Sequence, residues 1–500
     1  MAYIFGVASQ EHDLYRIFRD FMTGCGRPGQ IEFSGTGNGK LNNLIYPDGS
    51  ALMYETVTVT CVTAEPRKGT FSVQATGTGA LPDAVVGQVY KIAGIEFYLD
   101  FGSVDFAPGD TFTLRAGSKP ANKVGFSRVQ GRVNTVTETI TLTCTRAGVQ
   151  GGQPAQFSVA GDVSGALPAL TQGTLYEANP IKLLLPLDAT ANQYAVGDTI
   201  TLRTRINSLR QAGQHWATLR QVPSTATVQF GKTVYDGDSE LVLKGPGLSG
   251  TDEIFYGMQR QWSDGDARAN WNHFPMAGFV PNLSLSDQPQ MQGGNSPSAA
   301  RASHTMWSQS IPYTIIANGR RFILLTRSNI YYSQSYQGFI LPSTLPKYWG
   351  YPYFSGGTGD SRDPTWSSLP SARSAFWNYL GENGGGSAWV LDEAKRWNLV
   401  YGANVEQTGP YPLSRHTPTT AYPHSEQQMA GLRNNLDGTV PLFQVQITPN
   451  RGFLDGVYAV PGRDGRQPEE IIVTREGKRL LVAQNHHRSG FNDFCAFALE

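Results

Sequence analysis

The chain has 500 residues, and its 40 Lys and Arg residues balance its 40 Asp and Glu residues, so its formal charge is zero. This balance removes the electrostatic argument for general nucleic-acid binding, while 40% hydrophobic residues exclude an intrinsically disordered chain. Charged residues reach only 16%, well below the usual quarter, whereas Gly (56) and Pro (30) are abundant, so we expect a turn-rich, mainly β protein of several domains.

The N-terminal segment, residues 1–54, contains one amphipathic helix and a glycine-rich stretch. Apolar residues recur there at helical spacing and end at Gly24 and Gly26: Leu14, Ile17, Phe18, Phe21 and Met22. This stripe predicts a helix that packs against a sheet. Met1–Gly6 lacks the features of a secretory signal, and no window approaches 18 uninterrupted apolar residues, so neither a signal peptide nor a membrane span is predicted.

The stretch Gly35–Lys40 superficially resembles a phosphate-binding loop. The full pattern needs a Gly where Ser34 stands, and it needs Ser or Thr after the Lys, but Leu41 follows, so the magnesium ligand is missing. We interpret the stretch as a flexible glycine turn. No nucleotide or other cofactor is expected.

Two later segments are copies of one pattern, which we place at residues 55–118 and 138–205, with a linker at 119–137. Five motifs return in order, namely Glu55–Cys61 as Glu138–Cys144, Phe71–Val73 as Phe157–Val159, Gly79–Pro82 as Gly165–Pro168, Gly87 and Tyr90 as Gly173 and Tyr176, and Gly109–Arg115 as Gly197–Arg203. The first motif alternates strictly with period 2. Each copy is about the size of a small β-sandwich or barrel, and the repeat is too long for a solenoid.

The repeated Asp110 and Asp198 are candidates for metal ligands, but no second carboxylate or His accompanies them in both copies. We interpret each Gly-Asp pair as a turn that opens the last strand of its module. The four cysteines have no metal or redox spacing and are expected to be reduced thiols: Cys25, Cys61, Cys144 and Cys495. No metal site is predicted.

After a connector at 206–224, with a short helix around Leu209–Leu219, a larger β-rich domain with long loops is predicted for 225–500. Its expected strands lie at Thr225–Phe230, Ser239–Lys244, Asp252–Gln259, Ala388–Leu391, Trp397–Tyr401, Pro441–Ile447, Ile471–Asn485 (a hairpin) and Phe491–Leu499. Trp262–Phe279 looks irregular, and Asn282–Ser303 has the composition of a surface loop.

The most consistent local signal is Asn318-Gly319 between two apolar runs. Asn and Gly accept positive φ at both central positions of a tight turn, so a β-hairpin with these two residues at its tip is predicted. Beyond it, prolines such as Pro346 and Pro352 force extended chain around five aromatic residues: Tyr348, Trp349, Tyr351, Tyr353 and Phe354.

Several of these motifs resemble a family of virion structural proteins of tailed bacteriophages. They are Asn318–Arg321, Tyr336–Pro342, Tyr351–Gly357, Gly245–Ile254 and Gly477–Glu500, and the resemblance covers most of the chain beyond about residue 210. It implies a component of the tail, collar or baseplate region, made in the bacterial cytoplasm and located in the virion. Its implied partners are other virion proteins and copies of itself.

Catalytic constellations are not found. Asp264 and Asp266 near His273 are interpreted as a solvated Asp-Gly turn, because the calcium-loop pattern lacks its later acidic ligands. His486 and His487 are adjacent, so on a strand they point to opposite faces and cannot easily share one ion. The serine-elbow and zinc-helix motifs do not occur. The sequence therefore predicts that the protein is not an enzyme.

The sequence thus favours a non-enzymatic structural subunit of a phage virion. The alternative is a receptor- or glycan-binding tail protein that uses the aromatic loop, because Tyr and Trp suit sugar stacking as well as subunit interfaces. The predicted interface residues are the five aromatics, Tyr348, Trp349, Tyr351, Tyr353 and Phe354. A host surface receptor is an open second partner, whereas specific nucleic-acid binding is not expected.

Overall fold

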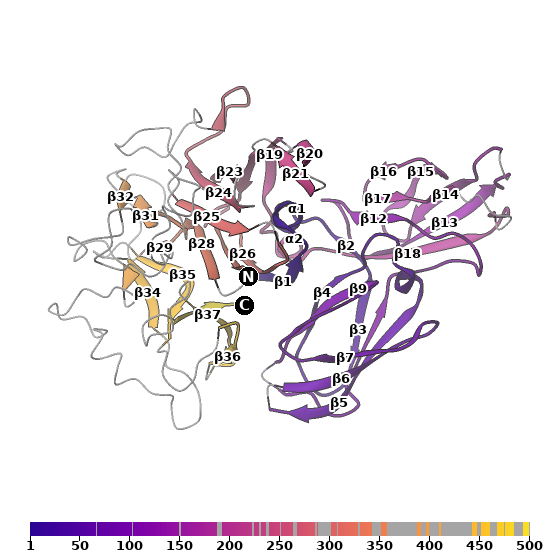
Figure 1. Cartoon of the computed structure of the whole chain (residues 1–500), viewed down its shortest axis with the longest axis horizontal. Coiled ribbons are helices and arrows are strands. Elements are labelled where there is room, and N and C mark those ends of the chain that lie inside the picture. The colour runs from indigo at the N-terminus through magenta and orange to yellow at the C-terminus, as the bar shows by residue number, and fades with distance from the viewer. Residues whose placement is uncertain are drawn as a thin grey trace. The chain divides into compact units, whose positions relative to one another are not determined.

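The computed structural model describes most of the N-terminal half and selected strands of the C-terminal half. The described residues are 1–66, 68–102, 104–149, 152–187, 193–222, 225–229, 232–236, 240–250, 252–263, 268–285, 288, 302–307, 309–328, 331–342, 352–357, 388–391, 397–399, 410–411, 443–447, 452–460, 468–474, 476–484 and 494–499. They form a mainly β protein of several antiparallel sheets, and none of these sheets closes into a barrel (Figure 1).

The chain divides into two compact units. Unit 1 comprises Met1–Tyr3, Val7–Met22 and Gly213–Glu500, and unit 2 comprises Ile4–Gly6 and Thr23–Ala212. The amphipathic helix expected within the 1–54 segment therefore belongs to unit 1, with the C-terminal half of the chain, while the glycine-rich stretch belongs to unit 2.

Unit 2 begins with a module of two sheets. The five-stranded sheet has the order β3 (Gln30–Ser34), β10 (Thr111–Arg115), β5 (Thr56–Glu65), β6 (Lys68–Ala75) and β7 (Gly79–Val85), and the three-stranded sheet has the order β4 (Leu41–Ile45), β9 (Ile95–Leu99) and β8 (Val89–Ile92). The alternation in β5 buries Val57, Val59 and Cys61 on one face.

The rest of unit 2 repeats this strand order. Its larger sheet runs β11 (Gly117–Ser118), β18 (Thr199–Arg205), β13 (Glu138–Arg146), β14 (Gln156–Gly161) and β15 (Gly165–Thr171), with β2 (Arg27–Pro28) also paired to β18, and its smaller sheet runs β12 (Arg128–Gly131), β17 (Ile181–Leu184) and β16 (Tyr176–Ala178). Residues 119–137, expected to be a linker, thus contribute β12 to the second module. That strand is only four residues long and lacks a clear apolar alternation, so it was not predicted from the sequence.

The two chain ends of unit 2 are fastened to each other by hydrogen bonds. Asn207 Nδ2 donates to the carbonyl of Cys25 (3.3 Å), and Arg210 Nε donates to the carbonyl of Gly24 (3.1 Å). Asn207 also caps the helix α2 (Ser208–Gln211) by accepting from Leu209 N at 2.8 Å. The predicted helix at Leu209–Leu219 is therefore only one turn long, and the last three residues of the predicted range belong to the strand β19 (Ala217–Val222).

The described residues of unit 1 form three larger sheets and a hairpin. The first sheet runs β1 (Ala2–Ala8), β26 (Ile311–Ala317), β27 (Arg321–Ser328), β28 (Tyr331–Phe339), β30 (Tyr353–Gly356), β31 (Ala388–Leu391) and β32 (Trp397–Leu399). The second runs β19, β22 (Glu240–Gly245), β23 (Ile254–Ser263), β24 (Arg268–Met276) and β25 (Ala302–Trp307). The hairpin joins β20 (Thr225–Gln229) to β21 (Lys232–Asp236).

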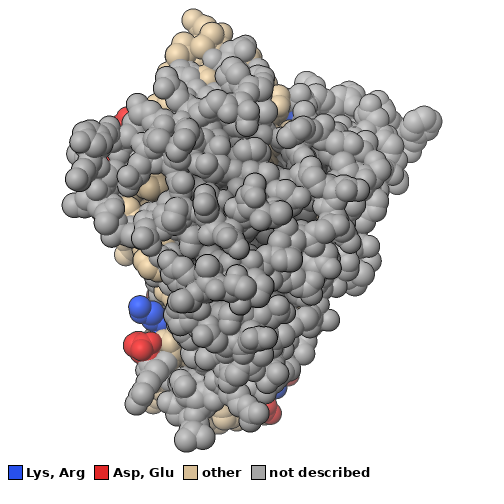
Figure 2. Space-filling model, turned by 90° about the vertical axis from the view of Figure 1, so that its left-hand side faces the viewer, with Lys and Arg blue, Asp and Glu red and all other residues tan. Residues whose placement is uncertain are grey.

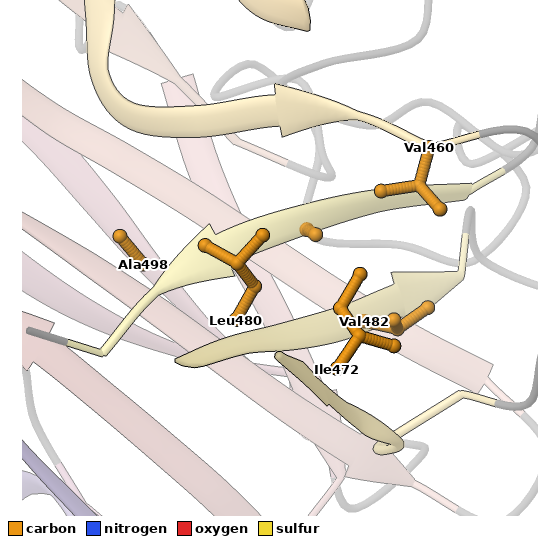
Figure 3. Close-up of a cluster of buried hydrophobic side chains, with 6 residues drawn as sticks. Val460, Ile472, Leu480, Val482 and Ala498 are labelled. Atoms are coloured by element: carbon orange, nitrogen blue, oxygen red, sulfur yellow. The ribbon is translucent and has the colours of Figure 1, made fainter. Parts of the chain in front are cut away.

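The third sheet of unit 1 lies near the end of the chain. It runs β33 (Pro410–Tyr411), β34 (Phe443–Ile447), β35 (Gly452–Ala459), β38 (Phe494–Ala498), β37 (Arg479–Gln484) and β36 (Ile471–Val473), with β29 (Leu341–Pro342) paired to β35. One face of it buries a cluster of aliphatic side chains, most of which are labelled in Figure 3: Val460, Ile472, Leu480, Val482, Ala496 and Ala498. This core ties the end of the described chain into the sheet.

Helix α1 (Glu11–Met22) covers part of the unit 1 core. Its buried side chains are Glu11, Leu14, Tyr15, Phe18, Phe21 and Met22. The Phe18 ring lies 4.9 Å from the Phe322 ring in an edge-to-face arrangement and 5.8 Å from the Trp271 ring. The helix therefore carries an aromatic anchor between strands β24 and β27.

The hairpin of β26 and β27 is present, but its turn differs from the predicted one. Asn318 pairs with Arg321 across the turn (N to O, 3.0 Å), so the central residues are Gly319 and Arg320, and neither Asn318 nor Gly319 has positive φ. The Asn318 side chain instead accepts hydrogen bonds from the backbone N–H of Arg320 (3.0 Å) and Arg321 (3.1 Å). Gly319 is needed because a Cβ there would lie 2.6 Å from Pro246 Cγ.

The segment Trp262–Phe279, expected to be irregular, contains the nine-residue strand β24. Residues 271–276 of this strand are all buried, so both of its faces are covered. A strand with two buried faces shows no polar alternation, and this is why its periodicity was not visible in the sequence. Similarly, β25 begins at Ala302, inside the segment predicted as a surface loop.

Candidate functional site

The densest arrangement of chemically active side chains among the described residues is a buried hydrogen-bond network in unit 1. Ser335 Oγ of β28 lies 3.0 Å from His273 Nε2 of β24 and 2.8 Å from His304 Nδ1 of β25. His273 Nδ1 lies 2.6 Å from the Tyr256 hydroxyl, and His304 Nε2 lies 2.7 Å from Thr326 Oγ1. The two histidines thus join strands of the first and second sheets of unit 1 through one series of hydrogen bonds.

A serine bonded to an imidazole is the geometry of an activated nucleophile. Here, however, Ser335, His273 and His304 are all 0% exposed, so neither water nor a substrate reaches the hydroxyl. Burial lowers the pKa of His304 to about 3, and burial together with His304 holds the pKa of His273 well below its ordinary value. Both rings are therefore neutral at physiological pH, and each ring nitrogen has a partner. The network therefore joins strands β23, β24, β25, β27 and β28 through hydrogen bonds inside the core.

A second buried cluster links helix α1 to strands β23 and β24. Glu11 forms an ion pair with Arg260 Nε through one carboxylate oxygen, and its other oxygen accepts from Trp271 Nε1 at 2.6 Å. Burial raises the pKa of Glu11 above its usual value, although Arg260 and Trp271 act in the opposite direction. Glu11 and Arg260 are 1% and 0% exposed, so this pair also belongs to the interior.

A third cluster surrounds Asp455 of β35. Its Oδ2 accepts hydrogen bonds from Asn318 Nδ2 (2.8 Å), Arg320 Nε (3.0 Å) and Arg321 Nε (3.2 Å). Burial alone would raise the pKa of Asp455, but the guanidinium groups of Arg321 and Arg320 outweigh it and hold that pKa below its usual value. The hairpin tip of β26 and β27 is thus fastened to the third sheet of unit 1.

The glycine stretch of unit 2 does not form a phosphate cradle. Its backbone N–H groups point at the chain's own Asp110: Thr36 N donates to Oδ1 and Gly37 N to Oδ2, each at 2.9 Å. A Cβ on Gly35 would lie 2.3 Å from the same carboxylate. The hydrogen bonds from Ala107, Thr36 and Gly37 more than offset burial and hold the pKa of Asp110 below its usual value. Asp110 occupies the place that a phosphate would take.

The predicted interface residues fall into two groups. Tyr353 and Phe354 lie on β30 and are 0% exposed, with the Phe354 ring 5.5 Å from the Tyr336 ring, so the chain's own sheet covers them and leaves neither ring accessible to a partner. Their interface role was inferred from the aromatic run, which does not distinguish an exposed loop from a buried strand. Tyr348, Trp349 and Tyr351 lie outside the described residues, and their role stays a prediction.

Several other site residues suggested by the sequence lie outside the part of the chain that the structure describes. Asp264, Asp266, His486 and His487 lie outside the described residues. Across the part of the chain that the structure describes, no group of three or more His, Cys, Asp or Glu side chains is arranged to hold a metal ion. In that same part, no helix has the length and apolar character needed to cross a membrane. On the face in Figure 2, the visible described acidic and basic side chains are few and both signs occur.

Sequence reasoning missed all three buried clusters of unit 1. Their members are far apart in the chain, as with Glu11 and Arg260, which are separated by 249 residues. The sequence contained one signal, because Asp455 interrupts an apolar run and a buried charge needs a partner of opposite sign. No family model matches this chain, and no curated protein is significantly similar to it.

Proposed function

We propose that this protein is a non-enzymatic structural subunit of a tailed-phage virion, in the tail, collar or baseplate region. The proposal starts from the motifs described above, and the observation that carries it is the pair of β modules in unit 2. Their strand orders match element by element, from β3-β10-β5-β6-β7 to β11-β18-β13-β14-β15 and from β4-β9-β8 to β12-β17-β16. Serial β modules are suited to scaffolding and attachment, which require surfaces but no reactive groups.

We infer that the two modules are copies of one fold. In support, the last turn of each module is built in the same way: Asp110 Oδ2 accepts from Ala107 N at 3.0 Å, and Asp198 Oδ2 accepts from Ala195 N at 2.8 Å. The β5–β6 and β13–β14 ladders each shift register directly after the equivalent cysteine. A shared irregularity at the same place is a stronger sign of common origin than shared alternation, because alternation is dictated by burial alone.

The proposal of a non-enzymatic role is supported by the polar side chains, which are buried or bonded to other groups of the chain. The one serine with imidazole neighbours described above is sealed in the core, and the glycine-loop N–H groups are occupied by Asp110. These side chains satisfy one another instead of facing solvent. Purified protein is expected to leave bacterial polysaccharide and peptidoglycan intact. Cleavage that disappears in Asp264→Ala or Asp266→Ala would contradict this part of the proposal.

Localisation in intact particles tests the proposal as a whole. Electron microscopy of virions that carry a tagged copy should place the tag at a fixed position in the tail, collar or baseplate, and particles lacking the protein should fail to assemble there. A protein absent from purified virions would refute the structural role.

A Trp349→Ala, Tyr351→Ala double variant separates the structural role from the receptor-binding alternative. If the predicted aromatic interface is right, the variant is under-represented in particles. Normal incorporation with loss of adsorption to host cells would instead assign these side chains to receptor or glycan binding.

A further inference from the structure

Two arginines of unit 2 stand directly opposite each other in a sheet. In the antiparallel pair of β2 and β18, Arg27 is the register partner of Arg205. Directly opposed residues of such a pair place their side chains on the same face, with Cβ atoms about 5 Å apart, and like charges at these positions repel. The pair therefore destabilises the sheet unless something compensates its charge.

The described neighbours of these arginines do not supply that compensation. Arg27 Nη1 donates to Asn43 Oδ1, and Arg205 Nη2 donates to the carbonyl of Leu44, both of which are neutral acceptors. Within the described residues, no carboxylate forms an ion pair with either guanidinium. Glu32 is shared by two other arginines, at 3.8 Å from Arg203 and 3.9 Å from Arg115.

A buried hydroxyl group adjoins the same place. Tyr46 is 3% exposed, and its hydroxyl has no hydrogen-bond partner among the described residues. Its ring packs closely against Gly29, where φ is +95° and an added Cβ would lie 2.9 Å from Tyr46 Cε2 and 3.0 Å from Leu44 Cδ2. A buried O–H without an acceptor costs free energy, so its persistence here requires an explanation.

Arg27 and the Tyr46 hydroxyl both influence the pKa of Arg205. Burial and then the Arg27 charge lower the pKa of Arg205 to about 9, and the Tyr46 hydroxyl is close enough to act on the same guanidinium. Both arginines are half-buried. Each guanidinium has five N–H donors, and the hydrogen bonds above use one of them on each side chain.

We propose that Arg27, Arg205 and the Tyr46 hydroxyl form a binding site for a tetrahedral oxyanion of the phosphate class. A dianion neutralises both guanidinium charges, and its oxygens accept from the two guanidinium forks and from the phenol O–H. Asn43 holds its amide in place for this, since its Nδ2 donates to the carbonyl of Phe5 while its Oδ1 accepts from Arg27. The site is independent of the proposed virion role.

Isothermal titration of inorganic phosphate into the full chain, at constant ionic strength set with chloride, tests the site. Wild-type protein should bind phosphate at one site, Arg205→Gln should raise the dissociation constant about tenfold or more, and Tyr46→Phe should raise it several-fold. Arg203→Gln is the matched control, because it removes the same charge from the same face of β18 but from a side chain that already has Glu32. Its dissociation constant should stay within about twofold of the wild-type value, because the lost charge is outside the site and screened by salt.

Hydrogen exchange on the wild-type protein gives a second readout that does not depend on any variant folding. Phosphate should slow exchange of the backbone amides at 27, 29, 43–46 and 203–205 more than chloride does. Wild-type protein that distinguishes phosphate from chloride in neither experiment would overturn the proposal. So would Arg203→Gln weakening phosphate binding as much as Arg205→Gln, because the effect would then come from the general positive field of the strand.

Discussion

Acidification should destabilise unit 1 through its buried histidines. A base whose folded-state pKa lies below its unfolded value binds fewer protons when folded, so its contribution to stability is lost as the pH falls below the unfolded pKa. For His304 these values are about 3 and 6.5. Linkage then gives a loss of about 2.5 kcal/mol between pH 7 and pH 4.5 for this residue alone, at about 1.4 kcal/mol per pH unit. His273 acts in the same direction.

Tryptophan fluorescence isolates the relevant unit, because all nine tryptophans lie at or beyond residue 216 and unit 2 ends at Ala212. Urea unfolding of unit 1 would be followed from pH 7 to pH 4.5 in the wild type and in His304→Gln. The variant loses the hydrogen bonds to Ser335 and Thr326 and is less stable at pH 7, but it takes up one proton fewer on unfolding. The stability difference between the two proteins should therefore narrow by about 2.5 kcal/mol on acidification.

Thr326→Val is the matched control for this experiment. It removes one hydrogen bond of His304 and leaves both imidazoles titratable, so its stability should run parallel to that of the wild type across the pH range. The raised pKa of Glu11 adds stability on acidification, with the opposite sign, but it does so in all three proteins and cancels in their differences. Equal losses in the wild type and in His304→Gln would refute the reasoning, because His304 would then accept its proton while still folded.

Three further outcomes follow from the packing. Asp455→Asn leaves Arg321 buried without its ion-pair partner and should cost about 3–5 kcal/mol in the fluorescence-detected transition, whereas Glu469→Gln, which breaks an exposed pair with Arg327, should cost less than about 1 kcal/mol. Gly109→Ala and Gly197→Ala place a side chain at φ +96° and +92° with no atom within 4 Å of the new Cβ, so calorimetry of unit 2 should show equal losses of about 1–2 kcal/mol. Gly26→Ala should lower the stability of unit 2 further, because its Cβ would lie 2.4 Å from Thr135 Cβ. Unequal losses of stability in Gly109→Ala and Gly197→Ala would contradict the equivalence of the modules.

Strands with one solvated face could be located from the sequence, and strands with two buried faces could not. β5 and β13 alternate strictly, and the predicted starts at residues 55 and 138 lie within one residue of the observed ones. β24 was missed because both of its faces are buried and its polar residues do not alternate regularly with apolar ones. The hairpin of β26 and β27 was found from its apolar flanks, but its turn type was wrong, because the Asn318 side chain bonds to the backbone of the turn and thereby shifts the tip by one residue.

The polar clusters could be predicted only in part. A charged residue inside an apolar run, such as Asp455, indicates that a partner exists, but the identity of that partner depends on the tertiary fold. The Arg27 and Arg205 pair is an extreme case, since 177 residues of chain separate two side chains that the β2–β18 register places opposite each other. Nothing local in either segment indicates the other.

The two chain ends of unit 2 are held together, so residues 23–212 form a self-contained insertion in the chain of unit 1. Its chain ends are joined by the bonds from Asn207 and Arg210 to Cys25 and Gly24, and within unit 1 the flanking residues also meet, with Trp216 N donating to the carbonyl of Met22 at 2.7 Å. The path from Met22 to Gly213 is therefore short enough to be closed directly. Recombination that deletes a module, or adds a third, would leave the backbone of unit 1 continuous and its sheets intact. A change in the number of modules therefore does not require a change in the sequence of unit 1.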